Sequence, residues 1–475
     1  MLPSTLPGAR TLPGLLLERL PWLESTPPAE AAERLRHLPG LLLMESARPG
    51  QRSRWSYLAA DPLLTLAAPA PGSDPFAEAR AVLGRLDPTP PGAADAPPFA
   101  GGLAGLLSYD LGRRFERLPA MALEDQQLPE LRLGLYDLVV AWDRRTGAAW
   151  LAGRALDGDL DRLARRREAL LALLTGRAAA TPASAGASGA PPARFRSNRD
   201  RHGFERMVGQ VREAIATGEL YQANVARRLE ASFAGDPWPL YRRLRIGDPV
   251  PYAAFLDLGP DEAGRRRALL SASPEPFLSV EPGGRVSTDP IKGTRPRGRS
   301  PEADRCLAAE LLASVKDRAE NTMIVDVLRN DLGRVCLPGS VRVPRLCRLE
   351  RTAAVQHLVS TVTGQLTPGQ DPLDLLAAAF PGGSITGAPK IRAMELIEAL
   401  EPVRRGPYTG SLVWVGPDGR LGSSILIRTF VADGTRLTLH VGGGITWRSE
   451  PTAEWEETRT KARGPLAALG ADEAE

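Results

Sequence analysis

The feature that most constrains the fold of this chain is a succession of short apolar segments joined by tight polar turns. In the second half, Pro417-Asp418-Gly419 separates segments 410–415 and 421–432, and Ala432-Asp433-Gly434 separates 421–432 from 436–442. Turns of this composition join neighbouring antiparallel strands. The pattern therefore predicts mostly antiparallel sheets and argues against a doubly wound parallel architecture.

A stretch of linker composition divides the chain. Residues 176–192 consist mainly of Ala, Gly, Ser, Thr and Pro, which is typical of linkers. We predict an N-terminal domain over 1–175, a linker over 176–196 and a second domain over 197–475, in the α+β fold class. Apolar periodicity predicts strands at 222–232, 252–258, 266–272, 277–281, 340–345, 356–363, 410–415, 421–432 and 436–442, and helices at 159–174, 201–217, 301–315, 317–330, 372–379, 388–399 and 451–468.

Composition excludes several classes of protein. With 43% hydrophobic and 24% charged residues the chain is typical of a globular protein, and it has no apolar run of the roughly 18 residues that span a membrane. Three cysteines without paired spacing argue against structural zinc, and the N-terminus lacks a secretory leader, so we expect a cytoplasmic protein. A net charge of +4 without clustered basic and aromatic residues gives no reason to expect nucleic-acid binding.

Lysine is rare in this chain, and its few positions are informative. Only Lys292, Lys316, Lys390 and Lys461 are lysines, against 56 arginines. Arginine serves wherever a cation only has to be solvated or to pair with a carboxylate, whereas lysine offers an amine that can lose its proton. For each lysine taken singly, chance retention and a chemical role are both open.

Two acidic pairs repeat one spacing on predicted helices. Asp317 and Glu320 are three residues apart, as are Glu454 and Glu457, and this spacing puts both carboxylates on one helix face. If the two faces converge, they offer hard oxygen ligands that favour Mg²⁺ over zinc or copper. Taken alone, each pair is more often a solvated helix surface.

Glu275 and Lys292 lie on either side of a predicted strand pair with a turn at Gly283-Gly284, and each is close to a proline. Partial desolvation turns a lysine into a usable nucleophile, and a glutamate near it can act as general acid. Spacing alone makes this only a weak pairing.

The glycine-rich segment 381–390 has the G-x-x-x-x-G spacing of a phosphate loop but lacks the Lys-Ser/Thr pair directly after it, which argues against ATP binding. We expect Ser384, Thr386 and backbone N–H groups of this segment to face an anion at a helix N-terminus. Gly442–Gly444 form a second place where backbone can approach a ligand closely, or else a strand-end turn.

Together these segments resemble the chorismate-utilising enzymes, the family containing anthranilate synthase component I, aminodeoxychorismate synthase component I, isochorismate synthase and salicylate synthase. The N-terminal part resembles the family more loosely, through LLMES (42–46) and RSRWSYLAADP (52–62). The resemblance implies two large, mostly antiparallel sheets packed as a sandwich with helices on the outside, as in anthranilate synthase component I. It rests on SPEPF (273–277), PIKGT (290–294), AENTMIVDVLRNDLGRV (319–335), VQHLVSTV (355–362), FPGGSITGAPKIRAMELI (380–397), IRT (427–429), GGGI (442–445) and ETRTKA (457–462), in the family's order.

Within this family, the lysine of PIKGT looks like the mark of aminodeoxychorismate synthase component I, since anthranilate synthases usually have alanine there. The resemblance therefore implies amination of chorismate to 4-amino-4-deoxychorismate, a precursor of p-aminobenzoate and folate. Lys292 would attack ring carbon 2 while Glu275 protonates the departing 4-hydroxyl. Mg²⁺ would be held by Glu320 and Glu457, with Asp317 and Glu454 in support.

The resemblance also implies binding residues. Some relatives bind tryptophan in the N-terminal domain, and the matching positions here are Ser46, Arg52, Ser53, Arg54, Trp55, Pro251, Tyr252 and Ala253. The substrate-binding positions would be His357, Thr386, Tyr408, Arg428, Gly442, Gly443, Gly444 and Lys461.

Ammonia is expected from a separate glutamine amidotransferase subunit, because no cysteine lies in a G-x-C-x-G elbow and the chain has only four histidines. The closest rival function is that of anthranilate synthase component I, which aminates carbon 2 and eliminates pyruvate. A non-catalytic scaffold subunit is a second rival, against which the joint presence of Glu275, Lys292, Glu320 and Glu457 argues.

Overall fold

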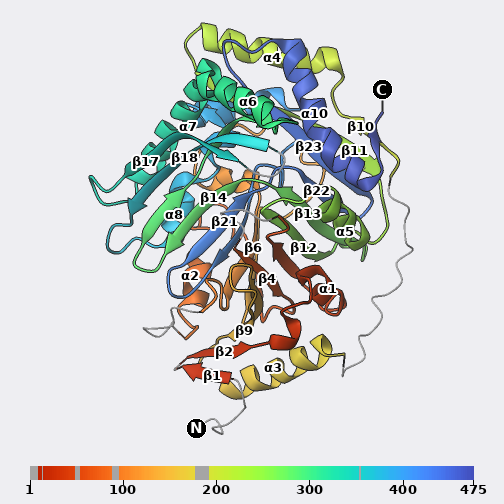
Figure 1. Cartoon of the computed structure of the whole chain (residues 1–475), viewed down its shortest axis with the longest axis vertical. Coiled ribbons are helices and arrows are strands. Elements are labelled where there is room, and N and C mark those ends of the chain that lie inside the picture. The colour runs from red at the N-terminus through yellow and green to blue at the C-terminus, as the bar shows by residue number, and fades with distance from the viewer. Residues whose placement is uncertain are drawn as a thin grey trace.

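Two large β-sheets form the centre of the molecule (Figure 1). The computed structural model describes residues 9–12, 14–48, 54–87, 96–176, 192–351 and 355–474. The larger sheet has 14 strands. Its order is β1 (Ala9–Leu12), β2 (Leu15–Arg19), β9 (Ala149–Gly153), β8 (Leu138–Asp143), β4 (Trp55–Ala59), β3 (Leu42–Glu45), β12 (Tyr252–Pro260), β13 (Arg266–Ser273), β22 (Thr429–Asp433), β23 (Arg436–Ile445), β11 (Gln222–Ser232), β10 (Arg194–Ser197) and β24 (Asp472–Glu473), with β19 (Gly387–Ala388) also paired to β11.

The smaller sheet has 10 strands and is antiparallel at every pairing between its described strands. Among the strands of the larger sheet that the structure describes, only β10 and β24 pair in parallel, so the prediction of mostly antiparallel sheets is confirmed. The order of the smaller sheet is β16 (Ile291–Pro296), β18 (Val355–Gln365), β15 (Arg285–Thr288), β14 (Pro276–Glu281), β21 (Leu421–Ile425), β20 (Ser411–Val415), β6 (Gly102–Leu107), β7 (Leu131–Tyr136) and β5 (Thr65–Ala67), with β17 (Arg342–Arg351) beside β18.

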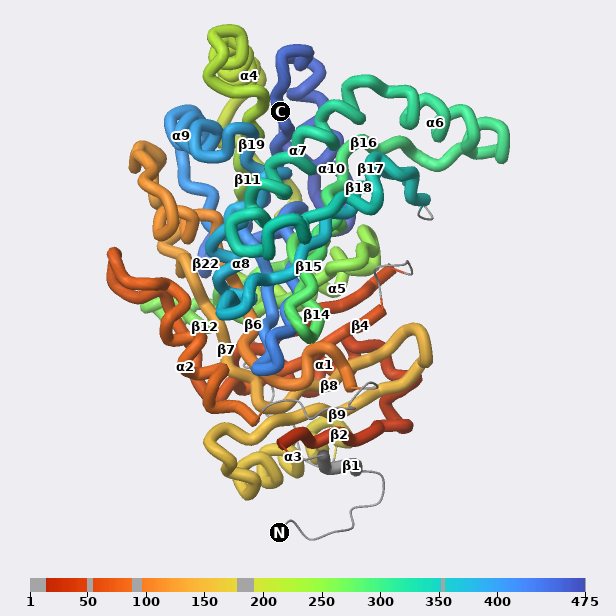
Figure 2. The backbone as a smooth tube through the Cα atoms, turned by 90° about the vertical axis from the view of Figure 1, so that its left-hand side faces the viewer, coloured from red at the N-terminus to blue at the C-terminus, as the bar shows by residue number. Residues whose placement is uncertain are grey.

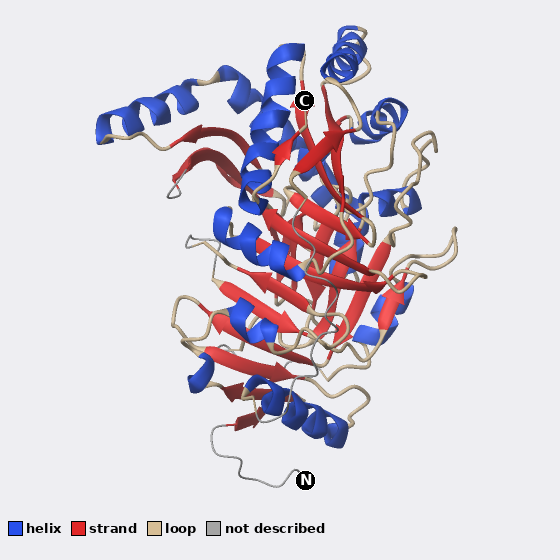
Figure 3. Ribbon diagram, turned by 90° about the vertical axis from the view of Figure 1, so that its right-hand side faces the viewer, coloured by secondary structure: helices blue, strands red, loops and turns tan. Residues whose placement is uncertain are grey.

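Helices cover the outer faces of the two sheets, while a shared apolar layer lies between them (Figure 3). That layer joins residues of both sheets, such as Leu106 and Leu412 from the smaller and Leu256 and Val431 from the larger. The predicted sandwich with outer helices is confirmed. The helices are α1 (Pro28–Glu33), α2 (Ala77–Leu83), α3 (Leu160–Leu174), α4 (Arg201–Ala216), α5 (Trp238–Gly247), α6 (Pro301–Ala313), α7 (Val315–Gly333), α8 (Pro372–Ala379), α9 (Lys390–Leu400) and α10 (Pro451–Leu469), besides the short 3₁₀ turns Pro21–Leu23, Tyr109–Arg114 and Gly383–Ile385.

Both sheets contain strands from each side of the predicted linker (Figure 2). β3 pairs with β12 in the larger sheet, and β6 pairs with β20 in the smaller. Residues 177–191 lie outside the described part of the chain. Strand β10 begins at Arg194, so residues 194–196, which were predicted as linker, belong to a strand. No helix within the described residues is long and apolar enough to cross a membrane.

The chain crosses between the two sheets at two places that matter for the site. It leaves β13 of the larger sheet and enters β14 of the smaller at Pro274 and Glu275, and it returns from β21 to β22 at Leu426–Arg428. The prediction of a single strand over 421–432 is therefore wrong. Arg428 has a positive φ of 50° at this crossing, where a continuous strand would stay extended.

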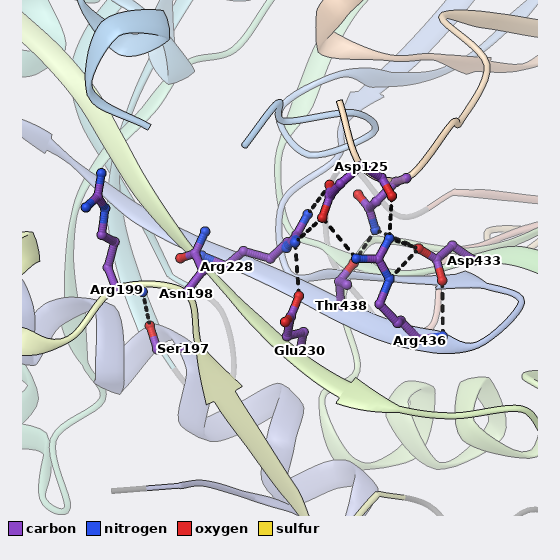
Figure 4. A network of polar contacts seen from close by, with 10 residues as sticks. Asp125, Ser197, Asn198, Arg199, Arg228, Glu230, Asp433, Arg436 and Thr438 are labelled. Carbon is purple, nitrogen blue, oxygen red and sulfur yellow. Dashed lines mark hydrogen bonds and ion pairs between the residues drawn. The ribbon is translucent and has the colours of Figure 1, made fainter. Parts of the chain in front are cut away.

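A polar network ties an N-terminal segment to the C-terminal half (Figure 4). Asp125 accepts hydrogen bonds from Arg228 of β11 at 2.6 and 2.8 Å and from Arg436 of β23 at 2.9 Å. Burial acts to raise the pKa of Asp125, but the two arginines outweigh it and lower that pKa to about 2. The segment before β7 is thus cross-linked to two neighbouring strands of the larger sheet.

Candidate active site

Glu275 and Lys292 come together through a third residue, Ser384. The Ser384 hydroxyl donates to Glu275 Oε1 at 2.9 Å, and the Lys292 ammonium donates to the Ser384 carbonyl oxygen at 3.2 Å. Glu275 is buried, and Lys292 is partly exposed. One residue of the glycine-rich segment therefore contacts both predicted catalytic side chains.

The surrounding elements fix this arrangement. Glu275 sits at the crossing between the two sheets, where its carbonyl accepts from Ile425 N–H at 3.1 Å. Lys292 lies on β16 opposite Leu358 of β18. Lys390, the third lysine along the chain, has other partners: its ammonium donates to Asp331 at 2.7 Å and to the Ala379 carbonyl at 2.8 Å. Lys390 thus anchors the end of the segment that carries Ser384.

The predicted anion cradle differs from its expected form. The Ser384 hydroxyl faces Glu275, and the Thr386 hydroxyl donates to the Gly382 carbonyl at 2.9 Å. In this structure the Ser384 hydroxyl therefore bonds Glu275, and the Thr386 hydroxyl bonds within the glycine-rich segment. Sequence spacing could not reveal the Ser384 contacts, because Glu275, Lys292 and Ser384 lie on three separate elements.

The two predicted acidic faces meet beside this pair, on α7 and α10. Lys316 at the start of α7 lies 3.9 Å from Glu320 and 3.8 Å from Glu454 of α10. Lys461 pairs with Glu457 at 2.7 Å and donates to the Gly442 carbonyl at 2.8 Å. Glu320 and Glu454 thus share one lysine across the two helices, while Glu457 pairs with Lys461; their convergence on a metal stays a prediction.

Asp317, the fourth carboxylate, turns to a different partner. Its Oδ2 lies 3.3 Å from an Arg295 guanidinium nitrogen, and its backbone N–H is capped by the Ser314 hydroxyl at 3.2 Å. Arg295 lies on β16, three residues beyond Lys292. Asp317 thus ties α7 to β16, the strand that carries Lys292.

Electrostatics link the carboxylates to three of the four lysines. Burial raises the pKa of Glu320, against the opposing charges of Lys292 and Lys316. Burial likewise raises the pKa of Glu454. Desolvation acts in the same direction on Glu457, but Lys461 outweighs it and the pKa of Glu457 is lowered.

The donor set suits a hard divalent cation. Glu320 Oε1 is buried and has no hydrogen-bond partner within the described residues, although burying such an atom is costly. Gly443 of β23 leaves room beside the acidic group: a Cβ there would lie 3.3 Å from Glu454 Oε2 and 3.6 Å from Glu457 Oε1. In the described part of the chain, no three acidic, histidine or cysteine side chains already converge as a metal cluster. The residues fit Mg²⁺ by chemistry and burial.

The three glycines of β23 pack closely against β11. Gly442, Gly443 and Gly444 pair with Ala226, Val225 and Asn224, and a Cβ at Gly444 would lie 2.5 Å from the Gln222 side-chain nitrogen. These glycines lie inside the long strand β23, so the alternative of a strand-end turn is wrong, and close approach to a ligand stays a prediction.

Two buried amides beside these glycines were missed by sequence reasoning. Both side-chain polar atoms of Gln222, and Oδ1 of Asn224, are buried without a hydrogen-bond partner among the described residues. Buried polar atoms are ordinarily satisfied. No sequence signal singled them out, since alternating polar residues are common in strands.

The other predicted substrate-binding residues occupy varied environments. His357 Nδ1 lies 2.9 Å from the Thr294 hydroxyl, one strand away from Lys292. Tyr408 is buried and stacks on His440 with a centroid distance of 5.0 Å. Arg428 lies 3.8 Å from Asp248. His357 is thus beside the catalytic strand, whereas Tyr408 packs in the interior.

A cavity of about 300 Å³ lies between the two sheets. Its wall combines aromatic residues with the polar groups Arg54, Ser279 and Asp289, and Asp289 is three residues before Lys292. Arg52 and Ser53 of the predicted effector set lie outside the described residues. The other six members all line this cavity: Ser46, Arg54, Trp55, Pro251, Tyr252 and Ala253.

Relatives of known name and structure match most of this chain. Aminodeoxychorismate synthase component 1 of Salmonella typhimurium is 40% identical over 468 residues, covering 95% of this chain and 97% of that protein. Anthranilate synthase component 1 of Streptomyces coelicolor is 41% identical over 448 residues, covering 92% of this chain and 84% of that protein. The crystal structure of anthranilate synthase component I from Streptococcus pneumoniae matches with a TM-score of 0.75 at 29% identity, covering 88% of this chain and 93% of that one. The family model described as chorismate binding enzyme matches residues 42–467, and this chain therefore belongs to the family of chorismate-binding enzymes.

Proposed function

We propose that this chain is component 1 of an aminodeoxychorismate synthase, which converts chorismate and ammonia to 4-amino-4-deoxychorismate. The observation that carries the proposal is the contact of one residue, Ser384, with both Glu275 and Lys292. The length of the match to the Salmonella protein, 95% of this chain and 97% of that protein, supports the same function.

The chain's own residues supply a nucleophile and an acid. Lys292, as the neutral amine, forms a bond to ring carbon 2 while the bond from carbon 4 to its hydroxyl breaks. Glu275 gives its proton to that hydroxyl, which leaves as water. Ammonia then adds at carbon 4, the bond between Lys292 and carbon 2 breaks, and a proton returns to Glu275. The net change is replacement of the 4-hydroxyl by an amino group.

Glu320 of α7 and Glu457 of α10 would hold Mg²⁺. Glu454 of α10 and Asp317 of α7 would support them. When bound, the metal would grip a substrate carboxylate and place positive charge beside the reacting ring. The buried oxygen of Glu320 that has no hydrogen-bond partner among the described residues supports this assignment.

The anionic groups of chorismate need cationic and N–H partners. Lys461, anchored on the Gly442 carbonyl, would supply one charge, and Arg428 at the crossing between sheets would supply another. The N–H groups of Gly442–Gly444 would bind a carboxylate, and His357 and Thr386 would contact the ring. Tyr408, which is buried against His440, would support the residues that bind the substrate.

A separate glutamine amidotransferase subunit would supply the ammonia. The printed name "component 1" of the relatives supports a two-component enzyme. The cavity between the sheets would take tryptophan or a similar amino acid, because it pairs an aromatic wall with charged and hydroxyl groups. The site of action would be the cytoplasm, which fits the three free cysteines of the chain.

Anthranilate synthase is the second candidate, favoured by the 41% identity to the Streptomyces protein. Lys292 distinguishes the two, since the resemblance places alanine at this position in anthranilate synthases. A covalent lysine at carbon 2 directs ammonia to carbon 4, whereas a free carbon 2 leaves it open to direct amination.

The test is to incubate the purified protein with chorismate, Mg²⁺ and ammonium salt at alkaline pH and to identify products by mass spectrometry. We expect an amine that retains the enolpyruvyl group. Anthranilate with release of pyruvate would establish the second candidate instead.

A further inference from the structure

Lys316 is the one lysine beside the carboxylates of α7 and α10 that the proposed reaction does not use. It lies between two carboxylates on different helices, Glu320 of α7 at 3.9 Å and Glu454 of α10 at 3.8 Å. Both distances are too long for a short hydrogen-bonded pair and typical of a shared ion pair. Lys316 thus occupies the place where two of the proposed metal ligands face each other.

The charges around this point balance without any ligand. Glu320, Glu454 and Glu457 contribute three negative charges when ionised, and Lys292, Lys316 and Lys461 contribute three positive ones. Burial is unequal: the Glu454 and Glu320 side chains are 5% and 14% exposed, whereas that of Lys316 is 43% exposed. The carboxylates are fixed in the interior, while the ammonium that neutralises them has an open path to solvent.

We propose that Lys316 is a resident counter-ion that Mg²⁺ displaces. In the metal-free protein its ammonium neutralises Glu320 and Glu454, and on metal binding it withdraws to solvent. This inference rests on the proposed metal site and adds a competitor to it. Lysine suits the role better than arginine, because its four-carbon stem is flexible and its ammonium makes no bidentate contact that would hold it in place.

Displacement has a consequence for the order of binding. A divalent cation alone would enter a region that already holds the Lys292 and Lys461 ammonium groups, so its charge is opposed. With Lys316 withdrawn, the three carboxylates, the two remaining lysines and the divalent cation together carry a charge of +1, so chorismate, a dianion, is attracted to the metal-loaded site. Lys316 therefore competes with the metal and keeps the buried carboxylates neutralised in its absence.

The experiment is to titrate the full-length protein with Mn²⁺ alone, as a paramagnetic substitute for Mg²⁺, and to measure free Mn²⁺ by electron paramagnetic resonance. Lys316→Met removes the charge and keeps an unbranched side chain, and we expect it to bind Mn²⁺ about tenfold more tightly than the wild type, as expected from removal of a competing partly buried charge. Lys316→Arg should bind it no more tightly than the wild type. Arg329→Met is the matched control, because Arg329 lies on α7 in a pair with Asp326 that is far along the helix.

Glu320→Gln separates this inference from the metal site on which it rests. Loss of Mn²⁺ binding in Glu320→Gln, together with tighter binding in Lys316→Met only, supports the metal site and the displacement of Lys316. Equal affinity of Lys316→Met and wild type, with binding still lost in Glu320→Gln, leaves the metal site in place and overturns the displacement. Binding in Glu320→Gln as tight as in wild type overturns the metal site and the displacement together. An equal gain in Arg329→Met would attribute the effect to net charge and also overturn the displacement.

Discussion

Replacing Ser384 with alanine separates the two contacts that this residue makes. The substitution removes the hydroxyl that donates to Glu275 at 2.9 Å but keeps the carbonyl that accepts from Lys292 at 3.2 Å. The nucleophile keeps its anchor, and only the proton donor loses a fixed position. Ser384→Ala therefore tests positioning of the acid by itself.

The expected loss follows from the environment of the contact. As Glu275 gives up its proton it becomes a carboxylate, and a hydrogen bond to a charged group contributes about 1.5–3 kcal/mol. Ser384 and Glu275 are both buried, so water does not readily replace the hydroxyl. At about 1.4 kcal/mol per factor of ten, we expect kcat to fall roughly 10- to 100-fold. The KM for chorismate should change less than about twofold, because the hydroxyl faces the acid rather than the substrate.

Steady-state kinetics of 4-amino-4-deoxychorismate formation with saturating ammonium salt measure both constants. Ser411→Ala is the matched control, because Ser411 is a buried serine whose hydroxyl bonds the Ser424 carbonyl at 2.9 Å in the middle of a sheet; it should keep kcat. Ser384→Thr, which retains a hydroxyl, should recover part of the loss. An increase in KM with unchanged kcat would refute the reasoning and assign Ser384 to the binding of a substrate anion.

Further predictions concern stability, the metal and the cavity. The lowered pKa of Asp125, about 2 against an ordinary 3.8, contributes about 2 kcal/mol of stability at neutral pH. This contribution is lost as pH falls from about 4 through about 2. The free energy of unfolding, measured in urea, should therefore be lower for Asp125→Asn than for wild type at pH 7, and the two values should approach each other near pH 2. An equal difference at both pH values would contradict this prediction. Glu320→Gln should abolish the Mg²⁺ dependence of the rate along with most of the activity, and full activity of wild type in EDTA would refute the metal role. Ser46→Phe should fill the cavity between the sheets and abolish tryptophan binding in calorimetry, while unchanged binding would place the effector elsewhere.

Elements with a strong local signal were predictable from the sequence. The helix predicted at 372–379 is α8 with the same bounds, because Asp371 caps its first N–H groups and Pro372 fits its first turn. The strand predicted at 222–232 is β11 with the same bounds. Local chemistry decides such boundaries, so tertiary contacts did not need to be known.

Elements that depend on the sandwich were not predictable. The single strand expected at 421–432 divides because its halves belong to different sheets, β21 to the smaller and β22 to the larger. Strand propensity is the same on both sides of such a crossing, so only packing reveals it. Helix α5, Trp238–Gly247, was not expected, because its prolines and glycine mask a helical pattern.

The site was predictable where spacing on one element decides it. The i, i+3 spacing put Glu454 and Glu457 on one face of α10, where both lie beside Gly443, and Lys316, one of four lysines, lies between Glu320 and Glu454. That Asp317 pairs with Arg295, or that Ser384 joins the catalytic pair, depends on the meeting of separate elements. Such contacts carry no sequence periodicity.

The most direct test of the central claim is product analysis of Lys292→Ala. The protein, chorismate, Mg²⁺ and ammonium salt are incubated together, and 4-amino-4-deoxychorismate is quantified by mass spectrometry beside the wild type. The covalent role of Lys292 predicts loss of this product, with intact folding checked by thermal unfolding. Formation of 4-amino-4-deoxychorismate at the wild-type rate would contradict the account.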